Sequence, residues 1–113
     1  MFILIFQVVF NDIKDSYPID LDLELSYTLT SFIQAGHGDR ICLYKLPYLQ
    51  PHEYVAYVWS KQGPDNTVTV KFPVSTLPKE EDFYQFQYLK GDNQVAGASV
   101  PFQLRKPGNS SQV

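Results

Sequence analysis

Apolar and polar residues alternate along several short stretches of this chain. No stretch carries apolar residues at the three- and four-residue spacing of an amphipathic helix. Between residues 21 and 29 every second residue is apolar: Leu21, Leu23, Leu25, Tyr27 and Leu29. The intervening residues are polar: Asp22, Glu24, Ser26 and Thr28. In the same way Val68, Val70 and Phe72 alternate with Thr69 and Lys71. A period of two predicts strands that bury one face.

Clusters of Pro, Gly, Asp and Asn separate these runs, as turns do between strands. The predicted strands cover residues 3–10, 21–29, 40–46, 53–59, 66–74, 82–89 and 95–104. Gly97 inside the last of them predicts a bulge or a close approach of two backbones. Residues 1–105 are therefore expected to form one all-β domain, an immunoglobulin-like sandwich of about seven antiparallel strands. Residues 106–113 are polar, contain Pro107 and Gly108, and are expected to be a flexible linker.

The stretch Asp82-x-Tyr84-x-Phe86 has the spacing of a tyrosine corner, in which a Tyr hydroxyl bonds to the upstream backbone. Antibody domains carry a Cys two residues after this Tyr, whereas this chain has Phe86. The two sheets must then be held together by packing rather than by a disulfide. We expect Phe86 and Tyr88 in the core, together with Trp59, the only tryptophan of the chain.

Composition narrows the possible functions. The chain has 113 residues, 44% of them hydrophobic and 15% aromatic, and a net charge of −3. A folded globule follows from this composition, and the charge provides no basic field for nucleic acid or anionic lipid. The apolar residues 1–6 fall far short of the roughly 20 needed to span a membrane. Direct membrane insertion is not expected, and a single Cys favours a cytoplasmic location.

Candidate catalytic and metal-ligating residues are few. Cys42 lies between Ile41 and Leu43 in a predicted strand, where a buried, inert thiol is more common than a nucleophile. His37 and His52 lie in predicted loops and do not have the spacing of a zinc site. The chain has no glycine-rich phosphate loop and no hydrolase or metalloprotease motif. The sequence therefore predicts a protein that is not an enzyme and binds no cofactor or metal.

Two segments resemble one known family. Residues 77–88 (LPKEEDFYQFQY) and 97–105 (GASVPFQLR) are similar to strings of the SKICH domain, and the likeness extends over residues 7–105. This domain opens selective-autophagy receptors of the calcium-binding and coiled-coil-domain type, and it occurs in some inositol polyphosphate 5-phosphatases. The strings of the first branch are closer. Arg40 lies where the family usually has a tryptophan.

The resemblance implies a partner and a site. In the similar receptors the domain recruits coiled-coil adaptors of the TANK-binding-kinase system and contributes to autophagy-initiation contacts. The alanine of the GAS motif lies where the adaptor docks, and Gly97, Ala98 and Ser99 match this motif. With the neighbouring Ala96 and Val100, which would add a shallow apolar strip, they form the candidate partner-binding site. A bulge that only turns the strand is the competing interpretation. The alternative function is a module that targets a 5-phosphatase-like protein to the membrane periphery.

Overall fold

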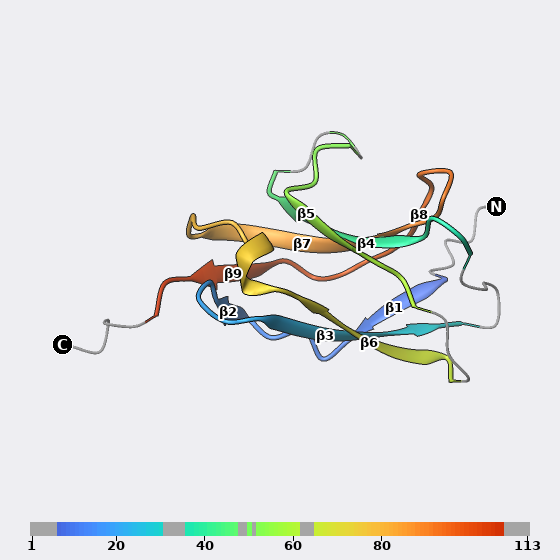
Figure 1. The fold of residues 1–113 in the computed structure, drawn as a ribbon, viewed down its shortest axis with the longest axis horizontal. Helices are drawn as coiled ribbons and strands as arrows, with labels where there is room; N and C mark the ends of the chain where they lie inside the picture. Colours follow the sequence, from blue (N-terminus) through green and yellow to red (C-terminus); the bar gives the residue numbers. More distant parts are fainter. Residues whose placement is uncertain (1–6, 31–35, 48–49, 51, 62–64, 108–113) are drawn as a thin grey trace, which may run out of the picture.

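The computed structural model describes residues 7–30, 36–47, 50, 52–61 and 65–107, which form nine strands and one short 3-10 helix (Figure 1). In chain order these elements are β1 Val8–Asn11, β2 Ser16–Pro18, β3 Leu23–Leu29, β4 Arg40–Lys45, β5 Ala56–Trp59, β6 Thr67–Phe72, η1 Val74–Thr76, β7 Asp82–Leu89, β8 Val95–Ala98 and β9 Phe102–Arg105. The predicted start of the first strand within residues 1–6 lies outside the described residues, as does most of the predicted linker.

The strands form two sheets that face each other (Figure 1). Sheet A has the order β1-β3-β6, and sheet B has the order β2-β9-β7-β4-β5, with β8 also paired to β7. Strands β3 and β6 of sheet A alternate buried apolar with more exposed residues. In β4 and at the end of β7, neighbouring residues on both faces are buried. The prediction of an all-β sandwich is confirmed.

The strand count differs from the expected seven for two reasons. The predicted strand 95–104 is divided into β8 and β9, both of which pair with β7. Strand β2 was not predicted, because its three residues end in Pro18 and show no alternation. The chain leaves sheet A after β1 and crosses to sheet B, where β2 pairs parallel to β9. Not all pairs are therefore antiparallel, and Pro18 is tolerated because β2 is an edge strand.

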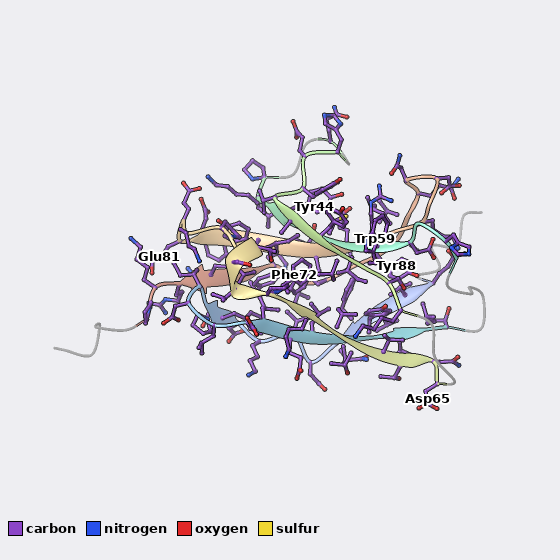
Figure 2. The ribbon with its side chains drawn as sticks, viewed as in Figure 1. Tyr44, Trp59, Asp65, Phe72, Glu81 and Tyr88 are labelled. Carbon is purple, nitrogen blue, oxygen red and sulfur yellow. The ribbon has the colours of Figure 1, made fainter. Side chains whose placement is uncertain are left out.

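Phe86 lies at the centre of the core, as expected of the residue that replaces a disulfide-forming Cys. Its ring centroid lies 5.5 Å from that of Phe72 in sheet A and 4.7 Å from that of Phe102 in sheet B. It also stacks on Phe10 at 6.0 Å. Figure 2 shows Phe72 and Tyr88 between the two layers. Packed aromatic rings thus connect the sheets, and the one cysteine, Cys42, is a free thiol.

Two predicted core positions are wrong. Leu21 is 59% exposed, because β3 begins only at Leu23 and Leu21 lies in the preceding turn. Trp59 is 58% exposed, because Ala56 and Val58 are the residues of β5 that face the core, which leaves Tyr57 and Trp59 on the outer face. The predicted inward residues of β3 and β6 are all buried.

The tyrosine corner is present. The Tyr84 hydroxyl donates a hydrogen bond to the backbone oxygen of Glu80 at 2.8 Å, and the Tyr84 side chain is fully buried. Burial raises the pKa of Tyr84, so the hydroxyl remains a donor at neutral pH. This bond fixes the entry into β7, the central strand of sheet B.

Removing this hydroxyl by Tyr84→Phe should lower the free energy of unfolding by about 1–3 kcal/mol, because the Glu80 carbonyl loses its donor. Chemical denaturation of the wild type and the variant measures this difference. Tyr57→Phe is the matched control, since Tyr57 is exposed on sheet B and should tolerate the same change. Equal unfolding midpoints for wild type and Tyr84→Phe would show that the corner does not stabilise the domain.

Gly97 lies where β8 of sheet B closely approaches β1 of sheet A. A Cβ atom built on Gly97 would lie 2.2 Å from the backbone oxygen of Val8 in β1, which is far inside contact distance. Next to it, the Gln7 backbone N–H donates to the Ala96 oxygen at 3.0 Å. The predicted close approach of backbones is confirmed, and it joins the first strand of sheet A to β8 of sheet B.

Gly97→Ala should destabilise the domain by about 1–3 kcal/mol or more, because β1 and β8 must move apart. Gly36→Ala is the control, since a Cβ there meets the Asp39 side chain at an ordinary 3.6 Å. Thermal unfolding of both variants tests this constraint. A Gly97→Ala variant as stable as Gly36→Ala would contradict the close packing of β1 on β8.

Candidate functional site

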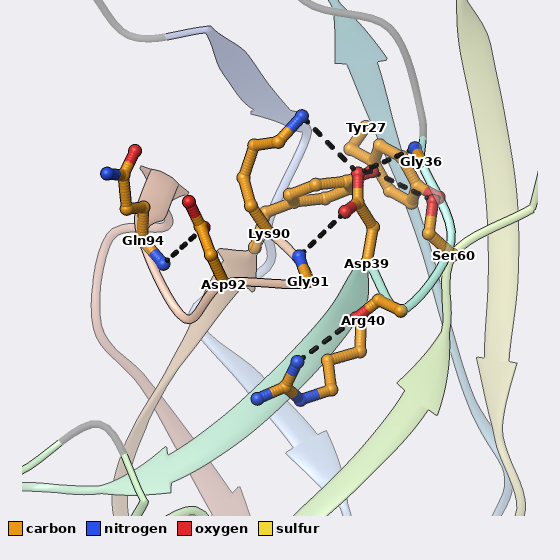
Figure 3. A network of polar contacts seen from close by, with 11 residues as sticks. Tyr27, Gly36, Asp39, Arg40, Ser60, Lys90, Gly91, Asp92 and Gln94 are labelled. Atoms are coloured by element: carbon orange, nitrogen blue, oxygen red, sulfur yellow. Dashed lines mark hydrogen bonds and ion pairs between the residues drawn. The ribbon is translucent and has the colours of Figure 1, made fainter.

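The turn that leads into β8 is held by the buried carboxylate of Asp39 (Figure 3). The Gly91 backbone N–H donates to Asp39 Oδ1 at 2.9 Å, and the Tyr88 hydroxyl donates to Oδ2 at 2.8 Å. The Lys90 ammonium lies 3.8 Å from Oδ2. Burial raises the pKa of Tyr88 well above its ordinary value, which keeps its hydroxyl a donor. One carboxylate therefore positions both the end of β7 and the turn after it.

A second set of hydroxyl groups extends this network to sheet A. Ser60 Oγ lies 3.0 Å from the Tyr88 hydroxyl and 3.1 Å from the hydroxyl of Tyr27 in β3. Asn93 completes the turn with a φ of 71°, as expected of the residue type that accepts the left-handed region. Strand β8 thus begins from a turn that is fixed with respect to both sheets.

Ser99 lies directly after β8 and binds β7 where the pairing of β8 stops. Its backbone N–H donates to the Phe86 oxygen at 2.8 Å, and its hydroxyl oxygen accepts from the Phe86 N–H at 3.0 Å. The Gln85 side-chain amide donates to the Ser99 backbone oxygen at 2.9 Å. The Ser99 hydroxyl takes the place of a backbone carbonyl as the acceptor for the Phe86 N–H, in a segment where Pro101 has no N–H to donate. Ser99 therefore holds the segment between β8 and β9 against β7.

The five predicted partner-binding residues divide into a buried and an exposed set. Ala96, Gly97 and Ser99 are buried, whereas Ala98 and Val100 are exposed, Val100 to 63%. The expectation that Ala96 shares a surface strip with Val100 is wrong, because Ala96 packs into the core between the sheets. Ala98 faces outward from sheet B, opposite Gln87 of β7. The role of these five residues, 96–100, in partner binding stays a prediction.

Beside Ala98 lies an apolar groove of about 190 Å³, which we call the β1–β8 groove. It is lined by Val8, Val9, Phe10, Ile13, Ala98, Ser99 and Val100. The residues from β1 and the turn after it were not predicted, because their approach to β8 depends on the packing of one sheet on the other. The one signal in the sequence was Gly97, which indicated a close backbone neighbour without identifying it.

Cys42, the one residue considered as a nucleophile in the sequence analysis, is fully buried in β4. Burial raises the pKa of the Cys42 thiol to about 11, so that very little of the reactive thiolate exists at neutral pH. Across the described ranges no group of three or more His, Cys, Asp or Glu side chains could hold a metal ion. Within the same ranges, no helix has the length and apolar character of a membrane span.

Comparison with known proteins assigns the chain to a family. The family model described as the SKICH domain matches residues 8–104. Calcium-binding and coiled-coil domain-containing protein 2 of Bos taurus is 32% identical over 113 residues, covering 95% of this chain and 25% of that protein. The protein of the same name from Xenopus tropicalis is 35% identical over 102 residues, covering 87% of this chain and 21% of that protein.

A second relative is the Tax1-binding protein 1 homolog of Xenopus tropicalis, 32% identical over 106 residues, which cover 88% of this chain and 13% of that protein. The chain thus spans a quarter or less of the length of these relatives. The matched region begins with β1 and ends within β9, so it contains both sheets and the whole Ala98 site. On these comparisons the chain belongs to the SKICH domain family.

Proposed function

We propose that this SKICH domain is a non-enzymatic protein-interaction module of an autophagy-receptor-like adaptor, and that it binds a coiled-coil protein through Ala98. The family resemblance implies a kinase adaptor of the TANK-binding-kinase type, or an autophagy-initiation protein, as the partner. We place the domain in the cytoplasm, where a buried free thiol such as Cys42 stays reduced. The words "coiled-coil domain-containing" in a relative's name support the adaptor rather than the phosphatase-targeting alternative.

The observation that carries this proposal is the position of Ala98 between two buried neighbours. Gly97 is pressed against β1, and Ser99 is hydrogen-bonded to β7, so the backbone on either side of Ala98 is held in place. The distance between a helix and its packing partner depends on the side chains at the contact. A small, exposed residue on a rigid backbone permits a close approach and costs little ordering entropy on binding.

The β1–β8 groove adds a place for an anchoring side chain. An apolar cavity of about 150 Å³ accommodates a benzene molecule, and the groove, at about 190 Å³, is larger. Its lining side chains are apolar apart from the Ser99 hydroxyl, which is already bonded within the domain. A Leu or Phe from the apolar seam of a coiled coil fits these properties, as in other complexes that place a helix in a groove.

Ala98→Glu should abolish binding of a coiled-coil fragment of the adaptor, with an affinity loss of at least about 100-fold. An unpaired carboxylate trapped in an interface costs several kcal/mol, and each 1.4 kcal/mol is a factor of ten in affinity. Because Ala98 is exposed in the free domain, the free energy of unfolding should change by less than about 0.5 kcal/mol. Titration calorimetry and thermal unfolding measure the two effects.

The matched control is Thr69→Glu, which introduces the same charge at an exposed position of β6 in the other sheet. We expect this variant to bind like wild type. Wild-type affinity for Ala98→Glu would show that the site is misplaced. A wild-type domain that binds no adaptor coiled coil would show that the proposed partner class is wrong.

A further inference from the structure

The outer face of sheet B extends from Ala98 to the aromatic residues of β5. Cα pairing connects Ala98 to Gln87, Gln87 to Cys42 and Cys42 to Tyr57, so that these four residues form one row across four strands. The neighbouring row runs from Val95 through Leu89 and Arg40 to Trp59. Residues paired in this way project to the same side of a sheet. Ala98 and Trp59 therefore belong to one continuous surface, which we call the outer face.

The exposed apolar residues of this surface lie toward its two sides. Between them, Cys42 and Leu89 are fully covered by neighbouring side chains, and Gln87 nearly so. On either side stand exposed apolar residues: Val95 at 49% exposure on β8, and Tyr57 at 40% and Trp59 at 58% on β5. Tyr57 and Trp59, whose ring centroids lie 5.3 Å apart, form an exposed apolar pair of the kind that marks a place where another molecule binds.

The aromatic side of the face is ordered before any partner arrives. Tyr44, Tyr54, Tyr57 and Trp59 form a series of edge-to-face contacts with ring centroids 6.3, 5.5 and 5.3 Å apart. Figure 2 shows Tyr44 on β4 and Trp59 on β5 of sheet B. Rings held by their neighbours lose little rotamer freedom on binding, and exposed Trp and Tyr are the residues that most often dominate binding energy.

Arg40 gives this face a positive charge that has no ion-pair partner among the described residues. Its guanidinium donates to the Gly38 backbone oxygen at 3.0 Å and to Asn93 Oδ1, which are both neutral acceptors. No ion pair between Arg40 and a carboxylate occurs within the described part of the chain. A partner that covers this face gains most in affinity and specificity if it places a Glu or Asp side chain beside the Arg40 guanidinium.

The width of the face indicates what kind of partner covers it. Ala98 and Tyr57 are three strand spacings apart, which is about 14 Å. A single helix that runs along the strands, about 10–12 Å wide with its side chains, would leave Trp59 uncovered when centred on Ala98. Two packed helices lie about 8–10 Å apart, so a two-stranded coiled coil spans the row.

We propose that the coiled-coil partner docked at Ala98 also covers Tyr57 and Trp59, and that it presents an acidic side chain to Arg40. This inference rests on the proposed function and extends the binding surface from β8 across β7 and β4 to β5.

Trp59 provides a direct test, because it is the only tryptophan of the chain and more than half exposed. The probe is a tryptophan-free, dimeric coiled-coil fragment of the kinase adaptor, with binding measured independently by calorimetry. We expect the emission of Trp59 to shift to the blue in proportion to the bound fraction. If wild type binds and the emission does not change, this inference is overturned while the proposed function stands. If wild type does not bind at all, both fail.

Two variants with matched controls complete the test. Trp59→Ala should weaken the affinity for the adaptor by about tenfold or more. Leu21→Ala changes an equally exposed residue outside the face and should leave this affinity unchanged. Arg40→Gln should weaken binding and reduce its dependence on salt, in contrast to Arg105→Gln at the exposed end of β9. Wild-type affinity for Trp59→Ala, or an unchanged salt dependence for Arg40→Gln, would contradict the extended interface.

Discussion

The contact of Phe86 with Phe10, Phe72 and Phe102 is the interaction on which the rest of the domain depends. These rings connect the central strand of sheet B to both outer strands of sheet A, which a disulfide does in many sandwiches of this shape. Packing of this kind needs no oxidising compartment. It also fixes the position of β7 relative to sheet A. Strand β7 in turn positions β8 and Ser99, which are hydrogen-bonded to it, and contributes residues to the outer face.

From this strand the candidate site follows by two constraints. Gly97 lets β1 come so close that no side chain fits between the sheets at that point, and the Ser99 hydroxyl replaces a ladder bond where β8 ends. The residue between them, Ala98, then has to face outward, with the β1–β8 groove on one side and the outer face of sheet B on the other. Gly97 and Ser99 of the GAS motif thus serve the structure of the domain, and Ala98 is the exposed residue of the three. The Asp39 network holds the turn before β8 and so preserves this arrangement.

Local patterns predicted those features that depend on one strand at a time. Alternation identified the inward faces of β3 and β6, and the spacing around Tyr84 identified the corner and its hydrogen bond. Features that depend on two distant strands were missed. Trp59 was placed in the core because large aromatics are usually buried, but the register of β5 on β4 turns it outward. The crossing of the chain to β2 has no local signal. For the contribution of β1 to the groove, Gly97 indicated a close backbone neighbour but could not identify it, because the neighbour is set by the packing of the sheets.

The measurement that most directly tests the Ala98-centred interface is a map of backbone and indole NMR shifts of the domain on titration with the adaptor coiled coil. We expect the largest changes in β8 and at Ala98, continuing across Gln87 and Cys42 to the indole N–H of Trp59. The outer residues of sheet A, such as Thr28 and Thr69, should change little. Large shifts confined to sheet A, with Ala98 and its row unaffected, would contradict the assignment of the binding surface.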